Sequence, residues 1–405
     1  MFFGELVTEG DAILSVGPGS SEGLFDSEID CGGNLLLPGF KNAHTHSAMT
    51  FLRSHADDLP LHEWLYNYVF PWEALLRPGD CYTLNRLAIL EYLTSGITAQ
   101  FDMYYHRDEV AQAALDSGFR TVLMDAVNDF GGTPEEELEE YGKYSAMGPL
   151  IRYQFGIHAE YTTKKELIRD VAAAARSVRM PFYSHMNETA DEVAGCMERY
   201  GMRPFELLES LDAFEYGGGG FHCVHVSGEE MEIMKRHDLS VITCPGSNMK
   251  LGSGIAPIKE YLDRGIRIGI GTDGPASNNC LDMFREMFLV TGLQKLQHGA
   301  DAVDAELVLK MACSDGALAM GLTDCDCLAP GKKADLILID LNQPNMQPLN
   351  QIPKNVVYSG SKQNVVLTMI GGKILYQNGS FRIGEDPETI YAEANRIIRR
   401  MEKEI

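Results

Sequence analysis

The stretch LLLPGFKNAHTH, residues 35–46, joins an apolar run to a His-x-His pair. A short apolar run of this kind is consistent with a buried strand. Side chains two residues apart in a strand point the same way, so His44 and His46 can face one centre. We therefore interpret the stretch as one strand of a parallel sheet whose polar end contributes to a site.

Seven further apolar runs follow, and stretches with a helical pattern, such as 164–179 and 229–237, lie between them. The runs cover residues 97–105, 120–127, 152–158, 181–185, 220–226, 239–244 and 266–273. Strands that alternate with helices are typical of βα units around a parallel sheet. Eight such strands predict an α/β fold, a (β/α)8 barrel of the TIM type.

The two ends of the chain carry strand patterns that no helices separate. Residues 11–16 and 28–31 have strand patterns on either side of a Gly/Ser-rich turn. Near the other end the strand patterns are 334–340, 356–358, 365–370 and 373–376, with Gly371-Gly372 as a hairpin turn. We predict a catalytic barrel over 37–332 and one small β-sandwich built from 1–36 and 333–405, ending in a helix over 387–405.

The composition is that of an acidic globular protein. Its 34 Lys and Arg against 58 Asp and Glu give a formal net charge of -24. Such a surface repels phosphate backbones and anionic lipids, so we expect a small-molecule substrate rather than a nucleic-acid or membrane partner. No apolar run reaches the roughly 20 residues of a membrane span, and no secretory signal pattern is visible. The nine cysteines are scattered, as expected for reduced thiols in a cytoplasmic protein.

Residues of metal-ligand type stand at the ends of four predicted strands. His44 and His46 end the first strand, His185 the fifth, His225 the sixth and Asp273 the eighth. Active sites of this fold form at the C-terminal ends of the strands. Three histidines and a carboxylate are ligands that a catalytic zinc takes while leaving room for water. A single His at a strand end is more often structural, but the coincidence across four strands favours a metal site.

Glu188 lies three residues beyond His185, in the sequence SHMNET. A bound metal lowers the pKa of water to roughly 7, and a nearby carboxylate can then move its proton. The alternative is a carboxylate in the first turn of a helix, where the helix dipole favours negative charge. Both interpretations can hold together, because a helix begins at 187–189.

These motifs resemble the amidohydrolase superfamily, in the branch of 5-methylthioadenosine/S-adenosylhomocysteine deaminases, which is related to the chlorotriazine hydrolases. The motifs follow one another in family order along nearly the whole chain. They are PGFKNAHTHSAMTFLRSHADDLPLHEWL (38–65), EYLTSGITAQFDMYYH (91–106), SHMNETADE (184–192), HCVHVSGEE (222–230), CPGSNMKLGSGIAPIKEYLDRGI (244–266), GTDGPASNN (271–279) and GKKADLILID (331–340).

The resemblance implies one divalent metal ion per subunit, zinc in the first place, with iron or manganese as alternatives. The implied metal ligands are His44, His46, His185 and Asp273. Asp273 would also take a proton from the water, His225 would orient that water, and Glu188 would give a proton to the ring nitrogen of the substrate. The resemblance further implies a homo-oligomer, a dimer or a tetramer.

On the substrate side, the resemblance implies that Glu91 binds the ribose hydroxyls and that His158 and Trp64 contact the substrate. The alternatives are a carboxylate on a helix face for Glu91 and core packing for Trp64. One segment departs from the family pattern: residues 128–150 are acidic and contain no Arg. A carboxylate on the substrate's tail therefore has less support than an uncharged 5′ substituent.

Three hypotheses follow from these residues. The first is a zinc-dependent deaminase of an adenine nucleoside such as adenosine, 5-deoxyadenosine, 5-methylthioadenosine or S-adenosylhomocysteine, which releases ammonia and the inosine analogue. The second is a hydrolase with the same metal site that deaminates or dechlorinates another heterocycle, such as a triazine or an oxidised guanine. The third is a binding protein without activity, which would require the loss of a ligand or of Glu188.

Overall fold

A computed structural model describes residues 1–19 and 23–405, and it confirms the barrel. Eight parallel strands surround one core, and the fourth is interrupted at Gln154. They are β4 (Phe40–Thr45), β5 (Ile97–Met103), β6 (Arg120–Met124), β7 (Ile151–Tyr153) with β8 (Phe155–Ala159), β9 (Phe182–Met186), β10 (Gly218–His222), β11 (Ser240–Thr243) and β12 (Arg267–Ile270).

The barrel closes where the chain beyond β12 meets β4. The amide of Asp273 donates to the carbonyl of His44 at 3.0 Å, and the amide of Thr272 donates to Asn42 Oδ1 at 2.8 Å. A Cβ at position 271 would lie 2.8 Å from the His44 backbone oxygen, so this close approach requires Gly271. The glycines of the eighth apolar run therefore allow the last strand to reach the first.

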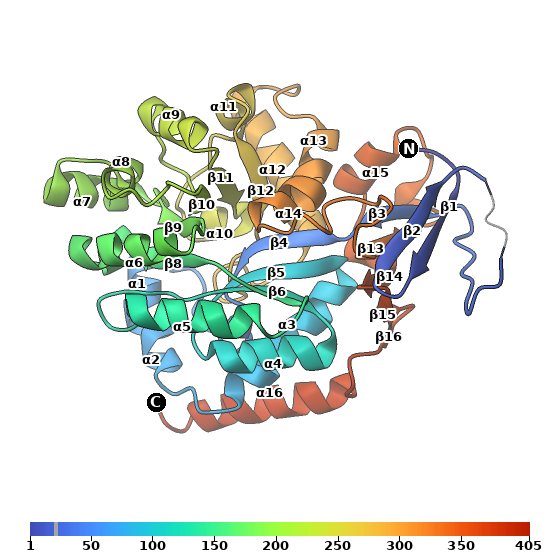
Figure 1. The fold of residues 1–405 in the computed structure, drawn as a ribbon, viewed down its shortest axis with the longest axis horizontal. Helices are drawn as coiled ribbons and strands as arrows, with labels where there is room; N and C mark the ends of the chain where they lie inside the picture. Colours follow the sequence, from blue (N-terminus) through green and yellow to red (C-terminus); the bar gives the residue numbers. More distant parts are fainter. Residues whose placement is uncertain (20–22) are drawn as a thin grey trace.

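Helices cover the outside of the barrel (Figure 1). The larger ones are α3 (Asp80–Thr94), α4 (Arg107–Ser117), α5 (Pro134–Ser145), α6 (Lys165–Ser177), α7 (Ala190–Tyr200), α9 (Gly228–Arg236) and α12 (Met283–His298). Helix α6 shows why: Ile168, Val171, Ala172 and Ala175 recur at helical spacing and are all buried, while the intervening polar residues face outward. Among the described residues, no helix is long and apolar enough to cross a membrane.

The ends of the chain form two small antiparallel sheets beside the barrel (Figure 1). One pairs β1 (Glu5–Glu9) with β2 (Ala12–Gly17). The other has the order β16-β15-β14-β13-β3, with β3 (Leu35–Pro38), β13 (Leu336–Ile339), β14 (Val365–Ile370), β15 (Lys373–Gln377) and β16 (Ser380–Phe381). The predicted sandwich and its Gly371-Gly372 turn, where both φ angles are positive, are therefore present.

Three details of the predicted strands are wrong. The apolar run 35–42 is two strands, because β3 pairs with β13 in the sandwich and only β4 enters the barrel. Residues 28–31 form no strand, whereas 5–9 do. Residues 356–358 end α15 (Ile352–Tyr358), a helix with Pro353 in its first turn that packs on α12 and α13 (Ala305–Lys310). The predicted Gly/Ser turn lies in part at 20–22, outside the described residues.

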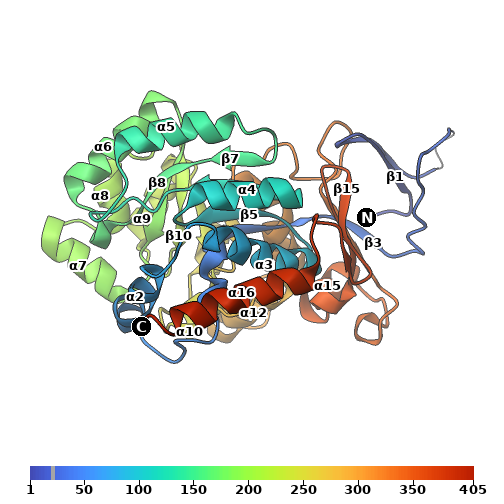
Figure 2. The same ribbon diagram turned by 90° about the horizontal axis from the view of Figure 1, so that it is seen from below.

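The C-terminal helix α16 (Pro387–Met401) packs against α3 of the barrel (Figure 2). Its buried residues Ile390, Ala394, Ile397 and Met401 lie on one face at helical spacing. The helix predicted over 387–405 is present, and it extends along the barrel rather than over the small sheets. The predicted domain boundaries at 36 and 333 stay predictions.

Candidate active site

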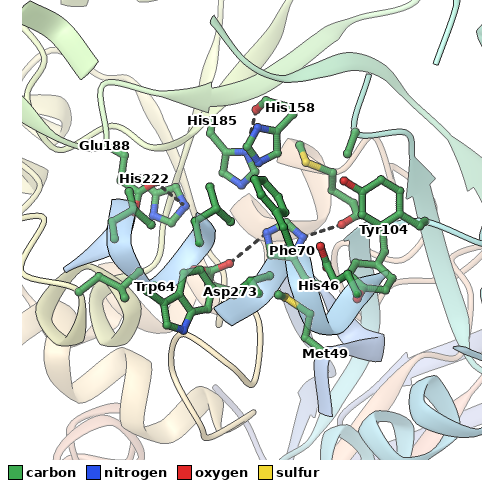
Figure 3. Close-up of a pocket in the computed structure, with 18 of the residues that line it drawn as sticks. His46, Met49, Trp64, Phe70, Tyr104, His158, His185, Glu188, His222 and Asp273 are labelled. Atoms are coloured by element: carbon green, nitrogen blue, oxygen red, sulfur yellow. Dashed lines mark hydrogen bonds and ion pairs between the residues drawn. The ribbon is translucent and has the colours of Figure 1, made fainter. Parts of the chain in front are cut away.

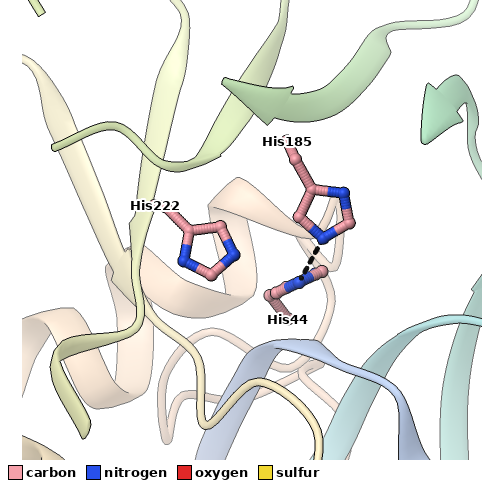
Figure 4. Close-up of side chains that lie close together, drawn as sticks. All are labelled: His44, His185 and His222. Atoms are coloured by element: carbon pink, nitrogen blue, oxygen red, sulfur yellow. Dashed lines mark hydrogen bonds between the residues drawn. The ribbon is translucent and has the colours of Figure 1, made fainter. Parts of the chain in front are cut away.

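A cluster of histidines and one aspartate lies at the C-terminal ends of the barrel strands. The Nε2 atoms of His44 and His185 are 3.1 Å apart, and Asp273 Oδ1 lies 3.6 Å from His44 Nε2 and 3.3 Å from His46 Nε2. His222, the last residue of β10, joins His44 and His185 in a second group whose ring nitrogens lie within 4.8 Å of one another (Figure 4). The structure thus brings together the four residues that were expected to bind the metal, and adds His222.

Hydrogen bonds orient three of these rings. The Nδ1 atoms of His46, His185 and His222 lie 2.5 Å from the Met103 carbonyl, 2.7 Å from the His158 carbonyl and 2.7 Å from Asn248 Oδ1, respectively. Carbonyl oxygens only accept hydrogen bonds, so each Nδ1 carries the proton and donates. Each Nε2 then points to the centre of the cluster and, in the neutral ring, presents a lone pair there, which is how histidines that bind metals are commonly held.

Asp273 faces these lone pairs with a carboxylate. Its Oδ2 accepts hydrogen bonds from Ser247 Oγ at 2.5 Å and Ser277 Oγ at 2.7 Å, so Oδ1 remains for the histidines. His46 Nε2 and Asp273 Oδ1 are 3.3 Å apart, and a lone pair on the nitrogen would repel the negative oxygen. A positive charge between the two atoms removes this repulsion. A proton can supply it: burial opposes protonation of His46, but its hydrogen bond to Asp273 raises the pKa of His46 to about 9. A divalent metal fits the same place, because this nitrogen and oxygen donor set is one that zinc takes.

Burial also sets the charge of His44. Its ring is fully buried, and this burial lowers the pKa of His44 to about 3. Its Nδ1 has no hydrogen-bond partner in the part of the chain that the structure describes. A neutral imidazole is the form that binds a metal.

Glu188 lies on the opposite side of the cluster from His46 (Figure 3). Its Oε1 accepts a hydrogen bond from Ser253 Oγ at 3.2 Å, and its Oε2 lies 3.8 Å from His222 Nε2. Burial raises the pKa of the Glu188 carboxyl, since the charged form is poorly solvated there. This carboxyl can therefore hold a proton close to the cluster.

The structure corrects the role expected of His225. Its Nε2 lies 2.7 Å from the Ser253 carbonyl, and the ring lines a depression outside the cluster. The reason is the length of β10, which ends at His222 rather than at 226. His222 and Cys223 both have positive φ angles, so the chain turns sharply and carries His225 away. In HCVH, the strand end is the first histidine and not the second.

A pocket opens above the cluster, and the expected Trp64, His158 and Glu188 all line it (Figure 3). Its apolar wall consists of Met49, Leu61, Trp64, Leu65, Val69, Phe70, Met103, Ala126 and Leu251. Much of this wall belongs to one segment, α1 (Leu61–Trp64), η2 (Leu65–Val69) and α2 (Phe70–Glu73). Burial lowers the pKa of His158 to about 3, so its ring is neutral and can serve as a hydrogen-bonding wall. The pocket suits a flat, mostly apolar ring with a few polar atoms.

Glu91 does not take the place expected of it. Its carboxylate forms an ion pair with Arg53 at 2.6 Å and accepts a hydrogen bond from the Leu281 amide at 3.1 Å. Besides Glu188 and Asp273, the carboxylate that lines the pocket is Glu73, at the end of α2. In the sequence, Glu73 follows an aromatic run (YVFPWE, 68–73) and had no pattern that distinguished it from a helix-face residue.

Two polar groups of the pocket lack strong partners. Burial raises the pKa of Glu73 to about 7, while Tyr104 and His46 oppose this shift. The hydroxyl of Tyr104 is buried and faces Glu73, but within 1–19 and 23–405 it makes no hydrogen bond of ordinary geometry. A buried polar group without a well-formed hydrogen bond is costly, so the Tyr104 hydroxyl beside Glu73 is suited to a polar ligand.

Known proteins resemble this chain over nearly its whole length. The amidohydrolase family profile matches residues 35–375. The 5-methylthioadenosine/S-adenosylhomocysteine deaminase of Desulfitobacterium hafniense is 40% identical over 410 residues, which cover 99% of this chain and 93% of that protein. The 5′-deoxyadenosine deaminase of Methanobrevibacter smithii is 38% identical over 99% of this chain and 94% of its own. The solved structure of an adenosine deaminase from Xanthomonas campestris, with bound zinc, has a TM-score of 0.91 and 29% identity, covering 99% of this chain and 94% of its own.

Proposed function

This chain belongs to the amidohydrolase family, and on that premise we propose that it is a metal-dependent hydrolase that deaminates adenine nucleosides. The observation that carries the proposal is the set of inward-facing lone pairs beside Asp273 and Glu188, at the bottom of a pocket with a ring-sized apolar wall. The relatives named as deaminases of 5-methylthioadenosine, S-adenosylhomocysteine and 5′-deoxyadenosine support the same reaction.

The residues that would hold the metal are His44, His46, His185 and Asp273. Zinc is the first choice, because it suits this donor set and is the ion bound in the Xanthomonas campestris relative. When bound, such an ion lowers the pKa of water to roughly 7 and so supplies hydroxide at neutral pH. Iron and manganese remain alternatives that metal analysis would separate.

The protein's own groups move the protons. Glu188, whose pKa burial raises, donates a proton to the ring nitrogen beside the amino-bearing carbon. Water attacks that carbon while His222 orients it, and the ionised Asp273 accepts one of its protons. That proton passes to the amino group, which leaves as ammonia when the carbon–nitrogen bond breaks. The new hydroxyl group returns its proton to Glu188, so the carbonyl of the inosine analogue forms and Glu188 is restored. This assigns to His222 the role first expected of His225.

The pocket walls position the substrate. The base lies against Trp64 and His158, which keeps its amino-bearing edge at the cluster. Glu73 accepts hydrogen bonds from the sugar hydroxyls, the role first expected of Glu91, and the Tyr104 hydroxyl provides a further partner. A carboxylate that accepts hydroxyl hydrogen bonds forms stronger interactions than a neutral acceptor.

An ammonia-release screen with metal-loaded protein tests the proposal. The panel contains adenosine, 5′-deoxyadenosine, 5-methylthioadenosine and S-adenosylhomocysteine, together with an aminated triazine and an oxidised guanine. We expect turnover of the adenosines alone. Turnover restricted to the triazine or the guanine would contradict the nucleoside assignment while leaving the hydrolase in place.

We also propose that the chain acts as a cytoplasmic homo-oligomer, a dimer or a tetramer, as the family resemblance implies. Sedimentation velocity at micromolar concentration would measure the oligomeric state directly. A monomer at all concentrations would contradict this part of the proposal without affecting the chemistry.

A further inference from the structure

The chain turns sharply between β9 and α7, and this turn carries Glu188. Strand β9 ends at Met186, and α7 begins at Ala190. Between them, Asn187 has a φ of 52°, a left-handed conformation that residues other than glycine seldom adopt. Glu188 follows, and its carboxyl points toward His222 (Figure 3). The direction of the Glu188 side chain therefore depends on what holds this turn.

The carboxyl of Glu192, in the first turn of α7, holds it. Its Oε1 accepts a hydrogen bond from the Asn187 amide at 2.8 Å, and its Oε2 accepts one from the Glu188 amide at 2.7 Å. Glu192 is only 6% exposed, so both hydrogen bonds form away from bulk water. One side chain thus fixes the peptide units on both sides of the left-handed residue.

This contact differs from ordinary capping of a helix. In a capping box, the third residue of the helix binds the amide of the N-cap residue. Here the N-cap is Thr189, whose Oγ1 accepts a hydrogen bond from the Glu192 amide at 3.1 Å, whereas the Glu192 carboxyl binds the amides of the two residues before Thr189. Burial raises the pKa of Glu192 to about 8 against the opposing effect of these hydrogen bonds, so the carboxyl is costly to place there.

A second buried carboxyl holds the same turn from another side. Glu230 is fully buried, and both of its oxygens lie 3.0 Å from Asn187 Nδ2. The Asn187 carbonyl accepts hydrogen bonds from the amides of residues 224 and 225, at 3.0 and 2.8 Å, in the turn that follows β10. The turns after β9 and β10 therefore form one hydrogen-bonded unit, in which Glu192 is the side chain that binds the amide of Glu188 itself.

We propose that Glu192 is a positioning residue for deamination, which holds the backbone of 187–188 so that the Glu188 carboxyl reaches the ring nitrogen of the substrate. The inference rests on the proposed function and adds a residue to it. Proton transfer requires hydrogen-bond reach, and a misplacement of about 1 Å can cost about 100-fold in rate. Glu192 does not line the substrate pocket, and among the described residues its carboxyl forms hydrogen bonds only with these two amides. Its effect on the reaction should therefore pass through Glu188.

The test is a double-mutant cycle of Glu192→Gln with Glu188→Gln. Ammonia release from 5-methylthioadenosine gives kcat and KM per folded, zinc-loaded chain. The Gln side chain keeps the size of Glu, but its NH2 group would face one of the two amide N–H groups. With Glu188 present, we expect kcat to fall about 10- to 100-fold and KM to stay within about threefold. In the Glu188→Gln background, the same substitution should lower the residual kcat by less than about twofold, because the group that it positions is absent.

Two controls separate positioning of Glu188 from stabilisation of the helix. Asp191→Asn removes an exposed carboxylate from the same first turn of α7, and Thr189→Ala removes the cap. Both variants should keep kcat within about twofold of wild type, while Thr189→Ala lowers the temperature of unfolding. A loss of kcat in Thr189→Ala as large as that in Glu192→Gln would assign the effect to capping and overturn the inference.

Equal losses of kcat from Glu192→Gln in the two Glu188 backgrounds, or a wild-type kcat in Glu192→Gln, would overturn the inference alone. Glu192→Asp, whose side chain is too short to reach both amides, repeats the cycle where the Gln variant does not fold. Failure of both variants to fold would assign Glu192 to stability and also overturn the inference. If the wild type released no ammonia from 5-methylthioadenosine or from the other adenosines of the panel, the proposed function itself would fail, and the inference with it.

Discussion

The two ends of the barrel both bury charged groups, but they satisfy them differently. At the base, Arg120 begins β6 and its guanidinium donates to both oxygens of Asp335, at 2.6 and 3.0 Å, and to the Pro149 carbonyl at 2.8 Å. Asp335 also accepts a hydrogen bond from the Gly371 amide at 2.8 Å. At the mouth, by contrast, ring nitrogens with lone pairs face the carboxylate of Asp273.

The difference separates stability from function. A buried ion pair whose hydrogen bonds are complete needs no further ligand. The pair between Arg120 and Asp335 is of this kind, and it joins the barrel to the small sheets. At the mouth, hydrogen bonds also orient the histidine rings, but their Nε2 atoms and Asp273 Oδ1 are satisfied only when a cation lies among them. In this fold, the C-terminal end of the strands provides catalysis and the opposite end provides stability. Variants at the two ends should therefore have opposite effects on activity and on unfolding.

The largest expected effect is at the mouth, in Glu188→Gln. The variant keeps the size of the side chain but removes the proton that the buried carboxyl donates. We expect kcat to fall by about 100- to 10,000-fold, the usual contribution of a general acid or base, with unchanged thermal unfolding. Initial rates of ammonia release measure it. Glu198→Gln, exposed on nearby α7, is the control, and a similar rate for both variants would exclude Glu188 from the chemistry.

At the base, Arg120→Ala should destabilise the protein without changing its chemistry. Removing one partner leaves Asp335 as an uncompensated buried charge, at a cost of about 3–5 kcal/mol. Urea unfolding measures the loss, and kcat per folded chain should stay within about twofold. Arg152→Ala breaks an exposed contact to Asp324 at 3.9 Å and should cost less than about 1 kcal/mol. Equal losses for the two variants would contradict the special role of the buried pair.

The two histidines of HCVH, His222 and His225, test which residues at the mouth take part in the reaction. His222→Ala removes a ring whose Nε2 faces the cluster, and it should lower kcat by about 100-fold or more. His225→Ala removes only a hydrogen bond to the Ser253 carbonyl, and it should lower kcat by no more than about fivefold. The two single variants serve as each other's control. The reverse order of effects would restore the role first expected of His225.

The smallest expected effect concerns pH. Burial raises the pKa of Glu73 to about 7, so this carboxyl is protonated below that pH and ionised above it. Because an ionised acceptor binds the sugar hydroxyls more strongly, KM for adenosine should fall roughly fivefold as pH rises from 6 to 8. Glu73→Gln should raise KM at pH 8 and remove this part of the pH dependence. A Gln variant with the wild-type pH profile of KM would show that Glu73 does not bind the sugar.

The sequence predicted those parts of the molecule that follow from local pattern. Eight apolar runs predicted eight barrel strands, and His44, His46, His185 and Asp273 meet because parallel strands end on the same side. Strand ends were less predictable. The positive φ angles at His222 and Cys223 end β10 early, and no residue pattern in GFHCVHV distinguishes that turn from a longer strand.

The substrate pocket depended on long-range packing and was predicted only in part. Glu73 reaches the pocket because the segment 61–73 folds over the barrel mouth, which periodicity along the chain does not reveal. Glu91 has a helix-face position compatible with either a substrate contact or an ion pair, and its partner Arg53 decides between them. Pairings across dozens of residues are set by tertiary structure, not by local propensity.

The central claim is that the mouth is completed by a metal ion and then deaminates adenine nucleosides. The most direct measurement removes metal by dialysis against a chelator and returns zinc in small steps, while ammonia release from 5-methylthioadenosine is followed. The account predicts negligible activity in the stripped protein and a linear recovery that levels off at about one zinc per chain, with no recovery in Asp273→Asn at the same zinc concentrations. Full ammonia release by protein in which elemental analysis detects no metal would contradict it.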